Sequence, residues 1–234
     1  MEPETRTKNI LAFLSELRKS VRSLGLAIIC GTGGLYLLSP ELLHQLQTHL
    51  DQKLAFFTVA GPFLAHLKLS FFTAVFILMP AILYCLWKAL GKPFGIEGKS
   101  LHWYVLSTCI LFYAGTSFCY FITLPYGVKF LLGFQSVQLK PVISINKFIT
   151  FVTVFILAFG VIFELPTFMV FSAKAGFCTR HTFISYRRYA VLIISIMAAM
   201  LTPTPDIVNM LLMGVPLYLL YELGIIVLRL LRVE

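Results

Sequence analysis

Six long stretches of this 234-residue chain contain no charged side chain. They cover residues 23–40, 69–87, 100–128, 148–163, 189–205 and 207–221. A helix needs about 20 apolar residues to cross the roughly 30 Å hydrocarbon core of a bilayer. With 59% hydrophobic and 12% charged residues, the chain has too little polar surface for a water-soluble domain. The sequence therefore predicts an all-α integral membrane protein with six transmembrane helices.

We expect a single membrane domain over residues 1–234, with spans near 23–40, 69–87, 103–128, 148–173, 189–205 and 207–226. The last two spans are short and are joined by Thr-Pro-Thr-Pro-Asp, which predicts a short final helical hairpin. Residues 1–22 carry apolar side chains at three- and four-residue steps, as in an amphipathic helix on a membrane surface.

Lysine and arginine are divided unequally between the two sides of this arrangement. Fourteen of the nineteen lie before the first span, between spans 2 and 3, between spans 4 and 5, and after span 6. The other side carries five: Lys53, Lys68, Lys129, Lys140 and Lys147. Because cytoplasmic segments carry the excess of positive charge, both termini are predicted to be cytoplasmic. This bias also explains the net charge of +9 without a nucleic-acid partner.

Acidic residues on the basic side are exceptions to this pattern. Considered alone, Glu16 is expected to pair with Lys19 or Ser20 within its helix. Glu97 is expected to be a solvated loop residue. Asp206, directly after Pro205, is expected to cap the last helix.

Glu222 lies near the end of the last apolar stretch, close to the predicted inner surface. Tyr218 and Tyr221 precede it, and Arg229 follows a turn or two later. Tyrosines anchor helices at the interface between lipid and water. We therefore expect interfacial anchoring and a local ion pair at this end of the helix.

Glu164 differs from the other acids because it lies within the fourth span, about 15 Å along the helix from Lys174. An ionisable group in hydrocarbon costs roughly 2.5–3.5 kcal/mol on insertion scales. We therefore expect Glu164 to face a cavity or a partner and to be functional. The alternative is a neutral acid that hydrogen-bonds a neighbouring helix. Pro166 is expected to kink the span at the same depth.

The sequence contains no arrangement typical of catalysis or metal binding. Its five histidines are scattered, and four of its five cysteines lie in apolar stretches. Phosphate-binding glycine loops and nucleophile motifs are absent from the sequence. We expect no cofactor, no metal ion and no enzyme activity.

Four motifs in this order resemble the TatC family, and the resemblance covers nearly the whole chain. They are FLSELRK at 13–19, FGVIFELP at 159–166, TPTPD at 202–206 and PLYLLYE at 216–222. The resemblance implies a receptor for twin-arginine signal peptides and a core translocase component that exports folded proteins using the proton motive force. It also implies that Glu16, Arg18 and Glu97 bind the signal peptide.

The resemblance further implies that Glu164 and Pro166 lie in a concave, glove-like bundle and act in partner binding or in distortion of the bilayer. Pro205, Asp206, Tyr218 and Glu222 are then structural or partner-contact residues. The implied partners are single-span TatA-type and TatB-type subunits and further TatC copies. The implied location is the bacterial cytoplasmic (inner) membrane, with a thylakoid or other organellar membrane as the alternative.

The sequence departs from the family pattern at three places. Ser20 stands where many relatives carry arginine, Met210 stands where many carry glutamine, and the loop before Glu97 is short. Two other functions also remain open at this point. One is a proton-coupled transporter of small solutes that uses Glu164 as its relay. The other is a structural scaffold for other membrane subunits.

Overall fold

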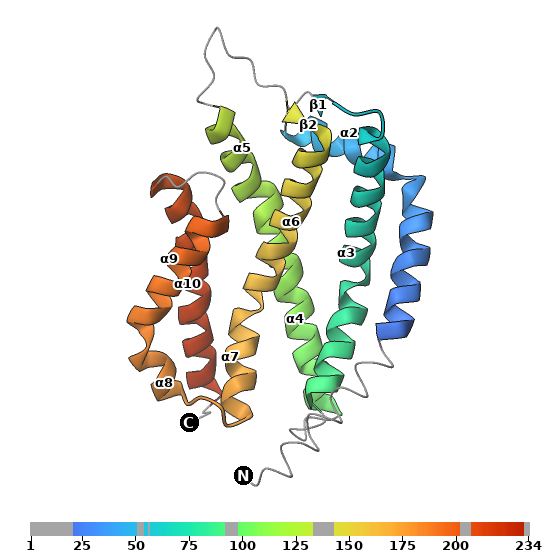
Figure 1. The fold of residues 1–234 in the computed structure, drawn as a ribbon. Coiled ribbons are helices and arrows are strands. Elements are labelled where there is room, and N and C mark those ends of the chain that lie inside the picture. The colour runs from blue at the N-terminus through green and yellow to red at the C-terminus, as the bar shows by residue number, and fades with distance from the viewer. Residues whose placement is uncertain are drawn as a thin grey trace. The chain divides into compact units, whose positions relative to one another are not determined.

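A computed structural model describes residues 21–50, 54–55, 57–91, 98–132, 143–201 and 207–231 (Figure 1). The first described helix is Val21–Tyr36. The labelled elements then follow in chain order: α2 (Ser39–Leu50), β1 (Leu54–Ala55), α3 (Gly61–Gly91), α4 (Lys99–Phe118), η2 (Cys119–Thr123), α5 (Leu124–Leu132), β2 (Ile143–Ser144), α6 (Ile145–Phe163), α7 (Leu165–Lys174), α8 (Arg180–Ser185), α9 (Arg187–Leu201) and α10 (Ile207–Leu230).

Each of the six uncharged stretches is helical over most of its length, so the expected all-α membrane fold is confirmed. Within the described residues, four segments are long and apolar enough to span a bilayer: Gly61–Gly91, Lys99–Lys129, Ile145–Lys174 and Met213–Leu230. The helix Val21–Tyr36 and α2, bent by 75° at their junction, make a fifth when taken together. Helix α9 has only 15 residues, as expected for the final hairpin, whereas α10 has 24 and is longer than expected.

The chain divides into two compact units. The first comprises Met1–Cys109 and Val142–Thr153. Its core cluster joins side chains of α2, α3 and α6: Leu43, Ala65, Leu69, Ile145 and Ile149. A short parallel pairing of β1 with β2 holds the segment before α6 against the segment before α3.

The start of this unit differs from the expected boundaries. The first helix ends at Tyr36, and α2 occupies part of the segment between the first two predicted spans. Pro40 and Glu41 suit a first helical turn, because that turn needs no proline N–H and favours a negative charge. The hydroxyl of Ser39 donates to the carbonyl of Tyr36 at 2.7 Å and lies 3.0 Å from Nδ1 of His66. These contacts fix the bend between the two helices.

The second unit comprises Ile110–Pro141 and Val154–Glu234. In it, α10 packs against α7, α8 and α9, and Figure 1 shows α9 and α10 side by side. Helix α7 is followed by Gly176, whose φ of 78° permits the turn out of the helix. Thr179 then begins α8 with a capping box in which its side chain accepts from the N–H of Thr182.

A π-helical turn, η2, interrupts the third apolar stretch. The N–H of Leu124 donates to the carbonyl of Cys119, five residues earlier. Pro125 follows directly and has no N–H to offer the preceding turn. The wider turn therefore accommodates this proline within a helical segment that runs from Lys99 to Lys129.

Candidate functional site

Glu164 occupies a one-residue break between α6 and α7. Its N–H donates to the carbonyl of Val161 at 3.1 Å, three residues back, and its carbonyl accepts from Phe168 at 3.0 Å. Pro166, two residues later, cannot donate a backbone hydrogen bond to the preceding turn. The helix is therefore interrupted at the depth where the acidic side chain lies.

The carboxyl group of Glu164 is enclosed by the protein. Both of its oxygens are inaccessible, and neither has a hydrogen-bond partner among the described residues. Buried polar atoms in native proteins nearly always have partners, so an exception needs an explanation. A partner molecule or a water that completes these hydrogen bonds would supply one.

Close packing of α4 against α6 positions the end of α6 next to this carboxyl group. A Cβ added at Gly115 would lie 2.5 Å from Cγ of Phe163 and 2.9 Å from the carbonyl oxygen of Phe159. A Cβ added at Gly160 would lie 2.7 Å from Cδ2 of Phe112. The two glycines thus allow the helices to approach, as small residues do in membrane bundles.

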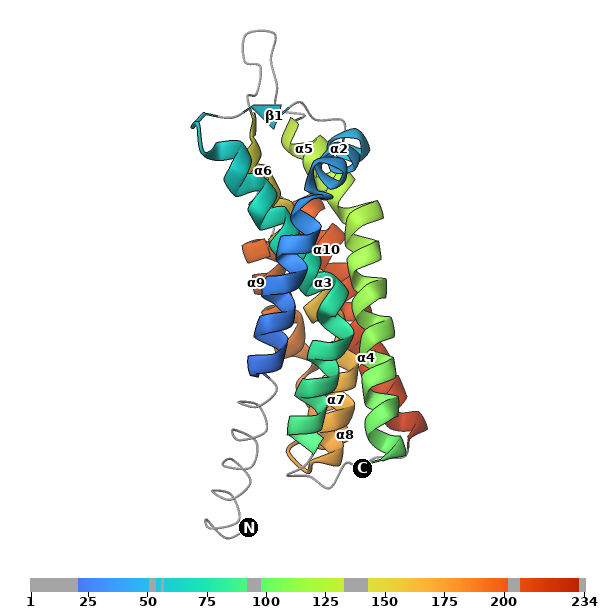
Figure 2. The same ribbon diagram turned by 90° about the vertical axis from the view of Figure 1, so that its right-hand side faces the viewer.

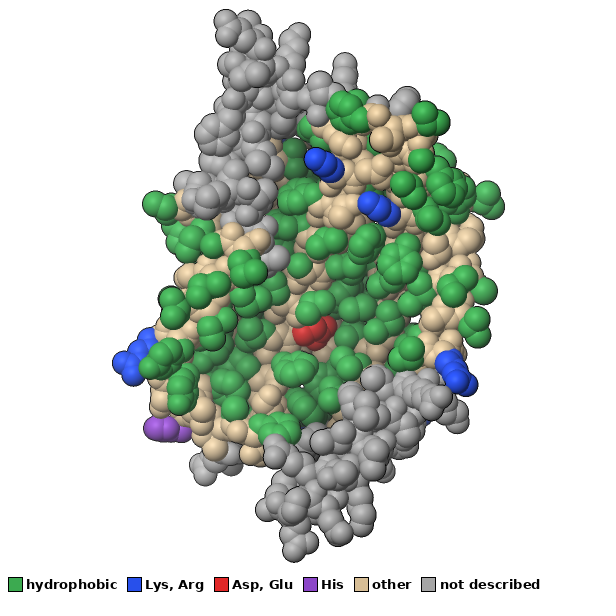
Figure 3. Space-filling model, in the orientation of Figure 1, with side chains coloured by type: hydrophobic (Ala, Val, Ile, Leu, Met, Phe, Trp, Pro, Cys, Tyr) green, Lys and Arg blue, Asp and Glu red, His purple; other side chains and the backbone are tan. Residues whose placement is uncertain are grey.

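Helix α10 packs just beyond the break. A Cβ added at Gly224 would lie 2.6 Å from the sulfur of Met169 and 3.4 Å from Cα of Pro166. The residues around Glu164 are therefore held by close contacts of α6 with α4 and of α7 with α10. Over α9 and α10, the surface in Figure 3 is largely hydrophobic.

A polar network joins α9 to α10 near the end of the hairpin that the charge bias assigns to the cytoplasm. The guanidinium of Arg187 donates to Oε2 of Glu222 at 2.8 Å, and the hydroxyl of Tyr218 donates to Oε1 at 2.9 Å. The hydroxyl of Tyr221 donates to the carbonyl of Phe183 at 2.7 Å. Glu222 and Tyr221 thus tie α10 to the preceding segment, and Tyr218 holds the carboxylate from within α10.

The sequence placed an ion pair at Glu222 but indicated Arg229 as the nearest base. The partner is instead Arg187, 35 positions earlier. Helical spacing reveals neighbours within one helix, whereas this contact arises from the hairpin. Arg188 lies over the ring of Tyr189, 5.1 Å from its centroid, and so is held beside the same network.

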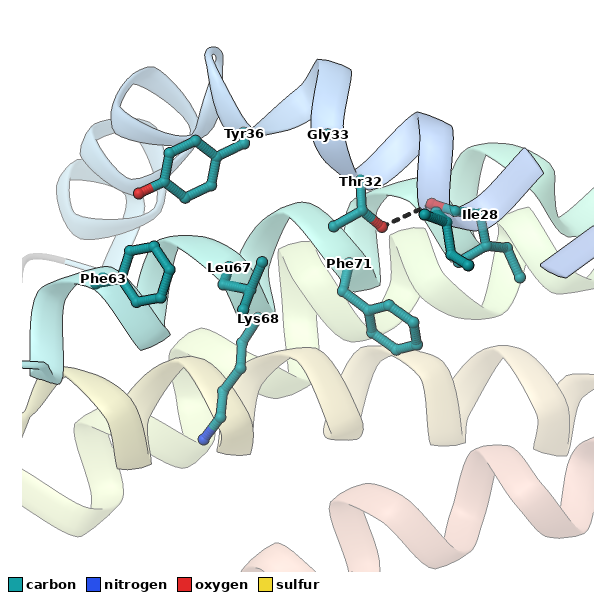
Figure 4. A pocket seen from close by; sticks show the side chains of 9 residues that line it. Ile28, Thr32, Gly33, Tyr36, Phe63, Leu67, Lys68 and Phe71 are labelled. Carbon is teal, nitrogen blue, oxygen red and sulfur yellow. Dashed lines mark hydrogen bonds between the residues drawn. The ribbon is translucent and has the colours of Figure 1, made fainter. Parts of the chain in front are cut away.

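An apolar groove of about 760 Å³ lies in the first unit, between the helix Val21–Tyr36 and α3 (Figure 4). Figure 2 shows these two helices side by side. Ile28, Thr32, Gly33, Tyr36, Phe63, Leu67 and Phe71 line the groove together with Lys68. In Figure 4 the side chain of Lys68 extends from α3 away from Tyr36, so its ammonium leaves the groove.

Several predicted site residues lie outside the described residues. They are Glu16, Arg18, Glu97, Pro205 and Asp206. Glu164 and Pro166 lie together at the α6–α7 break, and Tyr218 and Glu222 lie together on α10. Among the described residues, no group of three histidine, cysteine or acidic side chains could hold a metal ion.

The sequence missed two polar contacts. Arg187 was counted as one of the basic residues of its segment, and nothing in its spacing marked Glu222 as its partner. Lys68 was counted as one of the few lysines on the outer side, and it donates to the hydroxyl of Thr150 at 3.1 Å. Lys68 directly precedes an apolar stretch on the side that carries few lysines, and this position could have marked it as a residue with a specific contact.

Comparison with known proteins gives a consistent result. The sequence profile of the family described as Sec-independent protein translocase protein (TatC) matches residues 12–216. TatC of Carboxydothermus hydrogenoformans is 32% identical over 235 residues, which is 98% of this chain and 96% of the relative. TatC of Aquifex aeolicus is 31% identical over 220 residues, which is 91% of each chain.

Solved structures show the same similarity. Two crystal structures of the twin-arginine translocase receptor TatC, one of them in DDM, each match this fold with a TM-score of 0.78. They are 29% and 30% identical in sequence and cover 92% and 93% of this chain, and 98% of each solved chain is matched. The chain therefore belongs to the TatC family of Sec-independent protein translocase proteins.

Proposed function

We propose that this protein is the receptor for twin-arginine signal peptides in a translocase that exports folded proteins across the bacterial cytoplasmic membrane, driven by the proton motive force. The observation that carries the proposal is the match, over more than nine-tenths of the chain, to solved twin-arginine translocase receptors. The family is a translocase component and not a class of catalysts.

Recognition of two arginines requires accessible carboxylates. A guanidinium is planar and donates two parallel hydrogen bonds to one carboxylate, which lysine cannot do. Glu16 and Glu97 are our candidates for the two acceptors, and Arg18 lies two residues after Glu16. Both glutamates belong to segments that the charge bias places in the cytoplasm, where a precursor arrives.

The described carboxylates support this choice by their surroundings. Both oxygens of Glu222 already accept hydrogen bonds, from Arg187 and Tyr218. The oxygens of Glu164 are enclosed within the protein. Glu41 lies in the first turn of α2, on the outer side by the same charge bias. None of these three acids presents two unengaged oxygens to a cytoplasmic guanidinium.

Site-specific crosslinking tests the proposal. A photoreactive side chain placed at position 16 or 97 should crosslink to a peptide that carries two adjacent arginines. E16Q and E97Q should each reduce binding of that peptide, because an amide lacks the charge that the guanidinium needs. E41Q is the matched control and should bind normally. Unchanged binding in both E16Q and E97Q, with normal membrane insertion, would reject the receptor assignment.

The proposal extends to partners. TatA-type and TatB-type single-span subunits and further TatC copies are the proposed members of the complex. Glu164 is the proposed contact for a single-span subunit, because its side chain is only partly buried and its carboxyl group lacks a partner among the described residues. A single-span helix with a polar side chain at the same depth could complete its hydrogen bonds.

A further inference from the structure

Lys68 places a charged group within a membrane-spanning helix. It lies seven residues after Gly61, the first residue of α3, and therefore about 10 Å along the helix from its start. Leu64 and Phe71, one turn before and one turn after it, are 42% and 45% exposed. The lysine therefore lies between two partly exposed apolar side chains, near the end of α3 that the charge bias places outside.

One hydrogen bond holds the ammonium of Lys68 toward α6. It donates to Oγ1 of Thr150 at 3.1 Å, and that hydroxyl donates in turn to the carbonyl of Asn146 at 2.8 Å. Because the hydroxyl uses its proton on α6, it serves Lys68 only as an acceptor. An ammonium has three N–H donors, and the contact with Thr150 uses one of them.

A second lysine lies one helical turn from Thr150 on α6. Lys147 is exposed, and it precedes Thr150 by three residues, so both side chains lie on one face of α6. Among the described residues, neither lysine forms an ion pair with an acidic side chain. Figure 3 shows basic side chains over the upper ends of α6 and α3, with hydrophobic side chains around them.

We propose that Lys68, which Thr150 holds toward α6, and Lys147 bind the phosphate group of an anionic phospholipid in the outer leaflet. Two cations on neighbouring helices repel one another unless an anion lies between them, and this repulsion is stronger where lipid lowers the dielectric constant. A phosphate oxygen accepts hydrogen bonds from ammonium groups. The exposed leucine and phenylalanine on either side of Lys68 suit contact with acyl chains.

The position favours a lipid over an acidic partner protein. Lysines near the ends of spanning helices extend toward the headgroup level, where phosphates surround the protein on all sides. An acidic protein would have to bury a carboxylate beside exposed Leu64 and Phe71, at a cost that a lipid headgroup does not incur. The proposal does not depend on the receptor function and can fail without affecting it.

Native mass spectrometry of the purified protein tests the site. The protein is held in an uncharged detergent with equal amounts of phosphatidylglycerol and phosphatidylcholine. We expect preferential retention of phosphatidylglycerol, and a loss of about fivefold in that preference for each of K68Q and K147Q. K129Q removes an exposed lysine of α5 and should leave the preference unchanged. Equal melting temperatures of these variants would show that the fold is intact.

Any one of three results would overturn the lipid assignment. Retention of the preference in the K68Q, K147Q double variant would show that the lysines do not bind the lipid. Displacement of bound phosphatidylglycerol by an equal concentration of inorganic phosphate would assign the site to a free anion. Normal lipid binding with loss of a co-purifying single-span subunit would assign the lysines to a protein contact.

Discussion

Arg187, the first residue of α9, donates to the carboxylate of Glu222 on α10 at 2.8 Å. The side chains are 46% and 25% exposed, and the other carboxylate oxygen accepts from Tyr218. The pair therefore links the two ends of the final hairpin, at the end that the charge bias assigns to the cytoplasm. Because both carboxylate oxygens already accept hydrogen bonds from within the chain, we assign the carboxylate to holding α9 against α10.

This ion pair should contribute little to global stability and should show coupling between its members. Half-exposed pairs typically contribute about 0.2–1 kcal/mol. R187Q and E222Q should each lower the free energy of unfolding slightly, and the double variant should be no less stable than either single variant. A double-mutant cycle on unfolding in detergent measures the coupling. R188Q is the control, because Arg188 contacts Tyr189 and not Glu222. Additive effects of R187Q and E222Q would contradict the pairing.

Substitution of Gly115 should disrupt the approach of α4 to α6. In G115A, the new methyl group would overlap the ring of Phe163 and approach the carbonyl of Phe159. We expect a loss of about 1–3 kcal/mol in the free energy of unfolding, as for other overpacked cores. G214A is the matched control on α10, where an added Cβ meets no atom within 4 Å. That change should be neutral or stabilising by about 0.5–1 kcal/mol, since alanine favours helix. Similar destabilisation in both variants would show that the close contact is not the cause.

Uncharged stretches and charge bias predicted the helical membrane fold, because insertion into lipid depends on hydropathy along the chain. Pro166 likewise predicted the disturbance of the fourth span, which the structure places at Glu164. The end of the first helix at Tyr36 and the presence of α2 were not predicted. That boundary depends on the burial of Leu43 and Leu46 of α2 in the first unit, and the hydropathy of the sequence does not reveal such packing.

The candidate site was predictable residue by residue but not as a set of contacts. Glu164 stood out because an acid in hydrocarbon is costly. The pairing of Glu222 with Arg187 and of Lys68 with Thr150 depends on which helices become neighbours, and sequence spacing does not show this. The roles of Glu16, Arg18, Glu97, Pro205 and Asp206 stay predictions, as these residues lie outside the described part of the chain.

Replacement of both arginines of a signal peptide by lysines should weaken its binding by roughly tenfold or more, because the paired hydrogen bonds to each carboxylate are lost. The measurement is a titration of a fluorescent peptide against the purified protein, with a peptide in which a distant lysine is exchanged for arginine as the control. In E16Q and E97Q, the difference between the two peptides should shrink. An equal affinity for arginine and lysine peptides in the unchanged protein would argue against recognition through the guanidinium group.

Replacement of Glu164 by leucine should separate stability from function. The two enclosed oxygens have no partner among the described residues, so their removal relieves a polar burial cost of about 1–3 kcal/mol. We therefore expect E164L to unfold at a higher temperature than the unchanged protein while export of folded cargo is lost. E164Q keeps the shape and the hydrogen-bonding capacity, so partial export in E164Q would indicate that the carboxyl group acts by hydrogen bonding and not by charge. Full export by E164L, measured against the unchanged protein at equal membrane levels, would remove Glu164 from the mechanism.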